Sequence, residues 1–189
     1  MKFQKITAVF ALITSVLFFV FALGFCTDLY YLSYYIDEAS FMYVEGSHLY
    51  YEVQEFNKMA LIYSIVALIL VGIMYMMQNT KRRKYYVTNY VSSVLYIGFI
   101  IWLAIYDMKY SMLYKNEFLT KVDFATWAEW DSWMPTSSYT ESTFWFDCGN
   151  IVGAIGIISA ILIILNLIWK TVWMLMEKQA IAQLKGKEA

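Results

Sequence analysis

Four consecutive basic residues separate two long apolar stretches of this 189-residue chain: Lys81, Arg82, Arg83 and Lys84. The apolar stretches run over 59–77 and 87–106, and each is close to the roughly 20 residues that a helix needs to cross a bilayer. Basic residues in short loops between such spans stay on the cytoplasmic side. The cluster therefore predicts a tight cytoplasmic turn between two transmembrane helices, and it sets the orientation of both.

Two further apolar stretches, 6–26 and 150–173, complete the set of predicted spans. Since 61% of the residues are hydrophobic and only 15% are charged, the composition is not that of a soluble domain. We predict an all-α integral membrane protein with a single domain over 1–189. It is a four-helix transmembrane bundle with two extracytoplasmic loops, 27–58 and 107–148. A cleaved signal peptide, with a small-x-small site at 22–24, is the alternative for the first stretch.

The charges agree with this threading. Ten of the fourteen basic residues fall in the segments placed inside, and thirteen of the fifteen acidic residues fall in the two outer loops. Because the basic bias sets orientation, both termini are expected in the cytoplasm. Lysine outnumbers arginine twelve to two and there is no Asn-x-Ser/Thr sequon, which favours a bacterial plasma membrane. Lys170, near the end of the last span, is expected to extend its charged end to the cytoplasmic interface.

The second outer loop contains the signals of a short helix. Thr126 and Glu129 have the spacing of a capping box, and Pro135 would end the helix that they begin. Residues three apart are neighbours on a helix, so a set of tryptophans shares one face: Trp127, Trp130 and Trp133. In the first outer loop, weak alternation over 41–53 around Gly46 predicts a small hairpin.

Small side chains recur at a spacing of four, three and four along the last span: Gly149, Gly153, Gly156 and Ala160. Such a stripe lets two helix backbones approach closely, which is how helices associate in lipid. The stripe fits packing within this bundle as well as packing against another protein. Together with the tryptophan face it forms the predicted partner interface.

The polar side chains inside the spans are hydroxyls and amides, and helix–helix hydrogen bonding is expected of them: Thr7, Thr14, Ser15, Ser64, Asn89, Ser92, Ser93, Ser159 and Asn166. No charged residue is expected in the central part of any span. Proton relays, ion pathways and transporters usually need one, so these classes are disfavoured.

Cys26 ends the first span and Cys148 begins the fourth, both at the outer boundary. A disulfide between them is predicted, with two unpaired thiols as the alternative. His48 is the only histidine and lies in a loop, so a haem held by two histidines inside the bundle is excluded. Nothing in the sequence places a serine hydroxyl against the His48 ring as a Ser-His-Asp hydrolase requires. Asp123, Glu129 and Asp131 could bind a cation, but they lack the ligand spacing of a known cation-binding loop. We therefore predict no catalytic residue, no cofactor and no metal.

These features favour a non-enzymatic integral membrane accessory or scaffold subunit of a larger complex. A solute importer, for example one for carbohydrate, is the most natural host. The expected partners are the lipid bilayer and other integral membrane subunits, in a hetero-oligomer rather than a homo-oligomer, and no nucleic acid. A self-assembling oligomeric channel or pore is the alternative. The double-cysteine-glycine motif of tetraspanins and the Trp-Gly-Leu-Trp pattern of claudins are both missing, and topology alone does not transfer function.

Overall fold

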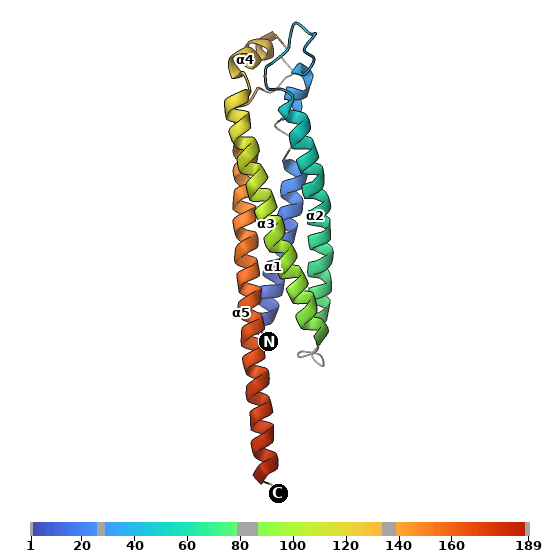
Figure 1. Cartoon of the computed structure of the whole chain (residues 1–189), viewed down its shortest axis with the longest axis vertical. Coiled ribbons are helices and arrows are strands. Elements are labelled where there is room, and N and C mark those ends of the chain that lie inside the picture. The colour runs from blue at the N-terminus through green and yellow to red at the C-terminus, as the bar shows by residue number, and fades with distance from the viewer. Residues whose placement is uncertain (1, 26–28, 79–86, 134–138, 188–189) are drawn as a thin grey trace.

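The computed structural model describes residues 2–25, 29–78, 87–133 and 139–187, and their regular elements are all helices (Figure 1). Four are long and apolar enough to cross a membrane: α1 (Lys2–Gly24), α2 (Leu49–Gln78), α3 (Val87–Lys121) and α5 (Phe144–Lys187). Two are short: the 3-10 helix η1 (Tyr30–Tyr35) and α4 (Phe124–Trp133). The predicted all-α, four-span architecture is confirmed.

The four long helices lie side by side and alternate in direction (Figure 1). The main packing joins each of α1 and α3 to both α2 and α5. η1 and α4 cover one end of the bundle, hereafter the capped end. The start of α1, the last residues of α2 and the first residues of α3 lie at the opposite end, hereafter the terminal end, and α5 projects beyond it.

The helices are longer than the apolar stretches that predicted them. α3 continues to Lys121, whereas the predicted span ends at 106, and α2 begins at Leu49 rather than 59. No glycine or proline occurs between 99 and 121, so nothing in the sequence stops α3 where its apolar run ends. Parts of both predicted outer loops therefore extend the bundle. The hairpin predicted over 41–53 is wrong, because that stretch forms turns that lead into α2.

Aromatic contacts hold the helices together towards the capped end. The ring of Phe25, just after α1, packs edge-on against Phe56 of α2 and Phe146 of α5, with both centroid distances 5.3 Å. On α3, Tyr106 and Tyr110 each pack on the Phe56 ring with centroids 5.6 Å away. Such pairs contribute about 0.5–1.5 kcal/mol each beyond the burial of their area. Phe56 therefore connects three of the four spans.

The nine polar side chains predicted inside the spans are all buried. Most of them donate to a carbonyl three or four residues earlier in their own helix, as Thr14 does to Phe10 at 2.9 Å. Two of these residues form side-chain hydrogen bonds to another helix. The Ser15 hydroxyl of α1 lies 3.0 Å from the Tyr96 hydroxyl of α3, and the Gln78 amide of α2 donates to Ser93 of α3 at 3.1 Å. The expected interhelical role therefore applies to some of these residues, whereas most satisfy their hydroxyls locally.

A turn in the segment between α1 and α2, hereafter the first connection, contacts the end of α3. The backbone N–H of Asp123 donates to the Glu45 carbonyl at 3.0 Å. Beside it, Gly46 has φ +81°, and a β-carbon there would lie 2.3 Å from the Lys121 carbonyl oxygen. Glycine is therefore required at position 46, both for its left-handed backbone and for this close approach. The contact brings the first connection, which carries Phe41, to the end of α3 that leads into α4.

Candidate functional site

The small-residue stripe of α5 faces other helices of the same chain. A β-carbon on Gly153 would lie 2.3 Å from the Met108 side chain of α3. On Gly156 it would lie 2.9 Å from the Phe18 ring of α1, and on Gly149 it would lie 2.1 Å from the Ser111 hydroxyl oxygen. Ala160 is also buried. The sequence left open whether the stripe packs within this bundle or against another protein. In the structure it packs within the bundle, and these contacts already occupy the face that a partner would need.

The tryptophans of α4 have three different environments. Trp127 is completely buried, with its ring 6.4 Å from Phe124 and 5.4 Å from Tyr139. Trp130 is half-buried, and Trp133 is 72% exposed. Trp127 therefore belongs to the core of the capped end, and the surface that α4 offers to another molecule is formed by the other two.

An exposed aromatic patch joins α4 to the first connection. Phe41, 81% exposed, has its ring 6.0 Å from that of Trp130, and the Trp130 ring lies 6.4 Å from that of Trp133. Hereafter the aromatic patch means these three residues. Large exposed aromatic groups of this kind mark surfaces that contact other molecules. The sequence analysis did not predict Phe41 as part of this surface. Its contact with Trp130 joins two distant segments of the chain, and no local sequence pattern signals such a contact.

The amino end of α4 is capped by Asp123 rather than by the predicted Thr126–Glu129 box. One carboxylate oxygen of Asp123 accepts the N–H groups of Ala125 and Thr126, at 3.1 Å and 3.2 Å. The other accepts the Thr126 hydroxyl at 2.6 Å. These hydrogen bonds from Thr126 and Ala125 hold the pKa of Asp123 below its ordinary value. The predicted helix is present, but its cap lies three residues earlier in the sequence.

Asp123→Ala should lower the thermal stability of the capped end, because it removes three hydrogen bonds from the start of α4. A carboxyl group with a lowered pKa contributes stability above its unfolded pKa of about 3.9, and this contribution is lost as pH falls through the lower folded value. The melting temperatures of wild type and Asp123→Ala should therefore differ at neutral pH and converge below about pH 4. Glu129→Ala, on the exposed side of α4, is the control. A difference that persists unchanged in acid would contradict this role of the carboxylate.

Asp107 is a buried acid inside the bundle, one residue beyond the predicted end of the third span. It is 1% exposed, and its Oδ1 atom has no hydrogen-bond partner among the described residues. An added β-carbon on Gly156 would lie close to both Ala104, one turn earlier on α3, and the ring of Phe18 on α1. Since Phe18 lies well inside the apolar run of α1, Asp107 lies at a depth that α1 crosses with uncharged side chains. The sequence assigned it to the second outer loop because the apolar run ends there.

Two further polar residues follow Asp107 at intervals of four towards the capped end. Ser111 is fully buried, and its hydroxyl oxygen also has no partner among the described residues. Lys115 forms an ion pair with Asp147 of α5 at 2.7 Å, and Thr143 donates to the other carboxylate oxygen of Asp147 at 2.9 Å. Residues four apart lie on the same helix face. A polar line therefore runs from the partly exposed ion pair into the interior of the bundle.

A second buried charge lies near the terminal end. Lys170 is 7% exposed, with its nitrogen 5.2 Å from the centre of the Tyr90 ring. The structure places this side chain against the first turn of α3, and its reach to the cytoplasmic interface stays a prediction. Asn89 and Asn166 are also buried, and both amide atoms of Asn89 have no partner in the described part of the chain. This end of the bundle therefore has a polar interior layer.

The remaining predicted site residues are placed only in part. The basic cluster 81–84 and Cys26 lie outside the described residues. Cys148 is half-buried and forms no disulfide with another described residue. Since Cys26 is not described, the pairing of the two cysteines stays a prediction. His48 is exposed and lies 3.3 Å from Glu38. Among the described residues, no group of three His, Cys, Asp or Glu side chains could hold a metal ion.

Comparison with protein-family models, with curated proteins and with solved structures finds no match for this chain. The geometry of the described residues is therefore the basis for any function of this chain. Two features of that geometry require an explanation beyond the stability of the bundle. One is the aromatic patch on the capped end, and the other is the buried line of Asp107 and Ser111.

Proposed function

We propose that the protein is a non-enzymatic, membrane-integral accessory subunit of a larger complex, and that it docks on its partner through the aromatic patch. The observation that carries this proposal is the exposure of Phe41 and Trp133 beside Trp130 on the capped end. Indole and phenyl rings offer large apolar areas with few rotors to immobilise, and for this reason they dominate many protein interfaces. A partner that covers the patch would remove these rings from water.

The orientation that we propose places the capped end outside the cell and both termini in the cytoplasm of a bacterium. The bias of basic residues towards the opposite segments supports it. A solute importer is the host that we favour, and carbohydrate is the leading solute class. Flat aromatic faces beside acidic side chains also suit sugar rings, so a patch on the importer's outer face fits this host.

The projecting end of α5 supports a role in assembly. It extends past the bundle at the terminal end (Figure 1), and several of its large apolar side chains are exposed: Trp173, Leu175, Met176 and Ile181. A single helix shorter than about 12–15 residues is marginal in water without tertiary packing. A neighbouring subunit would supply that packing. The chain therefore offers contact surfaces at both ends of the bundle.

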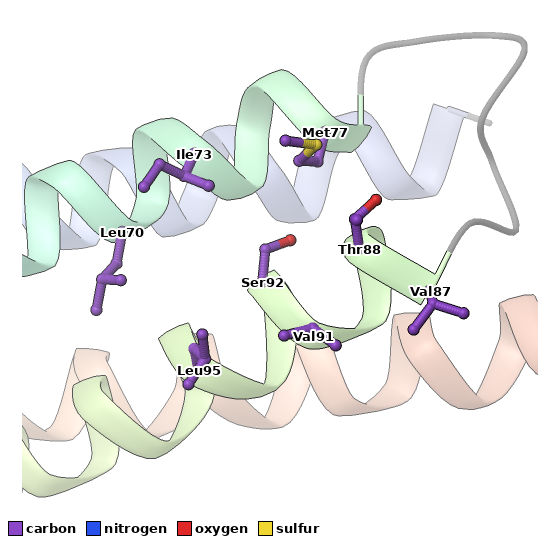
Figure 2. Close-up of a pocket in the computed structure, with 8 residues that line it drawn as sticks. All are labelled: Leu70, Ile73, Met77, Val87, Thr88, Val91, Ser92 and Leu95. Atoms are coloured by element: carbon purple, nitrogen blue, oxygen red, sulfur yellow. The ribbon is translucent and has the colours of Figure 1, made fainter.

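A pore made of several copies is disfavoured by the side chains that face outward. In the described spans these are mainly apolar, and a pore between copies would be lined by them: Val9, Ile13, Val20, Ile62, Ile69, Ile73, Val94, Ile105, Ile151, Ile158 and Leu165. A groove of about 290 Å³ lies between α2 and α3 near the terminal end, and Figure 2 shows the residues that line it. Aliphatic side chains such as Leu70, Ile73 and Leu95 line most of it, so it suits an acyl chain better than a hydrated ion.

The test is the mass of the complex after gentle detergent extraction. The wild-type protein should be recovered with other membrane chains, and the Phe41→Ala, Trp133→Ala double variant should be recovered mostly alone. Tyr51→Ala is the matched control, because this tyrosine is also an exposed aromatic residue, in the first turn of α2. It should retain the partner chains. Recovery only as multiples of the 22.2 kDa chain, with conductance after reconstitution, would overturn the proposal in favour of a pore.

A further inference from the structure

We propose that Asp107 is a proton-binding site within the bundle, and that protons reach it from the capped end past the Lys115–Asp147 ion pair and Ser111. This inference goes beyond the proposed docking function and does not depend on any partner. It stands on three observations: the burial of Asp107, the two buried oxygens without hydrogen bonds, and the polar line that joins them to the surface.

The location makes a carboxyl group costly. A buried carboxylate without a partner is strongly disfavoured, and burying even a neutral polar group without a hydrogen bond costs about 1–3 kcal/mol. Ionisable residues at membrane depth are rare and usually serve ion, substrate or proton pathways. An aliphatic residue at position 107 would avoid this cost. An acid there therefore indicates a ligand that compensates it.

The packing around Ser111 and Met108 leaves the proton as the ligand that fits. A single added β-carbon on Gly149 would already lie 2.1 Å from the Ser111 oxygen and 2.9 Å from the Phe21 ring. On Gly153 it would meet the Met108 side chain at 2.3 Å. Among the described residues, no group of three His, Cys, Asp or Glu side chains could hold a metal ion, so Asp107 has no companion ligands for one. A lysine from a partner cannot reach Asp107 either, because that residue is 1% exposed.

The route to the site follows one face of α3. Lys115, Ser111 and Asp107 are four residues apart, and such neighbours have β-carbons about 5–6 Å apart. At its outer end the side chains of Lys115 and Asp147 are 31% and 48% exposed, so water reaches them. Ser111 can both accept and donate a hydrogen bond, and a hydroxyl between two sites can therefore pass a proton.

Few other ionisable groups surround the site. On α3, Tyr106 interacts electrostatically with Asp107, and Tyr110 and Lys115 follow it towards the capped end. α2 contributes Tyr63, whose ring packs against that of Tyr106. α5 contributes Asp147, which is paired with Lys115, and Cys148. The described part of α1 from Ile6 to Gly24 contains no ionisable side chain. Lys109 is two residues from Asp107, a spacing at which helix side chains do not face each other; it is exposed, and its nitrogen lies 5.4 Å from the centre of the Tyr110 ring. Lys115 is two turns away and paired with Asp147. Neither cation is therefore in position to neutralise Asp107.

The transfer is balanced as a simple proton exchange. A hydronium ion at the Lys115–Asp147 pair gives up one proton and becomes water. The proton passes along the Ser111 hydroxyl and forms an O–H bond with a carboxylate oxygen of Asp107. The neutral carboxyl group can then donate to the Ser111 oxygen, which lacks a partner in the structure. Release to the capped side reverses these steps, and no redox partner is involved.

Infrared spectroscopy of the protein in oriented vesicles tests the proposal. The C=O stretching band of a protonated carboxyl group should be present in wild type, absent in Asp107→Asn and shifted in Ser111→Ala. It should disappear as the pH on the capped side is raised from about 5 to about 10. A double Lys115→Gln, Asp147→Asn variant should slow this response several-fold. Glu129→Gln, an exposed acid of α4, is the control and should leave the band unchanged.

Three results would overturn the proposal. The first is a band that persists in Asp107→Asn while circular dichroism shows unchanged helix content. The second is a band that does not respond to pH, because Asp107 would then be a permanently neutral structural group. The third is a response only to pH on the terminal side, which would place the entry elsewhere. Since the measurement uses the protein alone, it can fail while the docking function holds, and the reverse is equally true.

Discussion

Gly153→Leu should destabilise the bundle by about 3 kcal/mol, the upper end of the usual cost of overpacking, because the new side chain must displace Met108 and the α3 backbone. The Ala104 carbonyl oxygen lies only 3.1 Å from the position of an added β-carbon, and a backbone atom cannot move aside as a side chain can. The free energy of unfolding in mixed detergent micelles measures the effect. Gly98→Leu is the control, since a β-carbon on Gly98 would have no atom within 4 Å.

The two glycine variants separate the two roles of the small-residue stripe. Loss of stability in Gly153→Leu, with the Gly98 variant close to wild type, indicates packing inside the chain. A Gly153→Leu protein with normal stability that no longer binds its partner chains would contradict the internal role. That result would instead support the prediction from the sequence that the stripe is part of the partner interface.

Trp127→Ala should cost about 3–5 kcal/mol, the range measured for large aromatic residues removed from a core. Its ring is fully buried and contacts Phe124 of the same helix and Tyr139, so the substitution leaves a cavity in the capped end. Thermal unfolding and protease sensitivity of the segment around α4 measure the loss. Trp133→Ala, on the same helix but 72% exposed, should change stability by no more than about 0.5 kcal/mol. Equal effects of the two variants would contradict the assignment of Trp127 to the core and Trp133 to the surface.

The number and order of the spans could be predicted from the sequence because hydropathy is a property of contiguous segments. Each apolar stretch of sufficient length is a helix in the structure. The ends of the helices could not be predicted in the same way. α3 keeps its helical hydrogen bonds for more than three turns beyond its apolar run, since no glycine or proline interrupts it. Hydropathy therefore placed the end of the span at 106, one residue before the buried acid.

The candidate site was predicted less well because it depends on which helix faces meet. The spacing of the glycines showed that α5 packs closely against another helix, but the identity of that helix is a tertiary property. The same limit applies to α4, where three-residue spacing grouped Trp127 with Trp133, although the core covers the first and leaves the second exposed. The continued helical pattern of Ala104, Asp107 and Ser111 was the one signal that could have revealed the buried polar line.

Photo-crosslinking in intact membranes tests the docking account most directly. A photoreactive amino acid in place of Trp133 should form an adduct with another membrane chain. The same group in place of Ile161, an outward-facing residue of α5, is the control and should form none. The account predicts a single partner band at position 133 that disappears in the Phe41→Ala background. Adducts between two copies of this chain at position 133, or a partner band only at position 161, would contradict it.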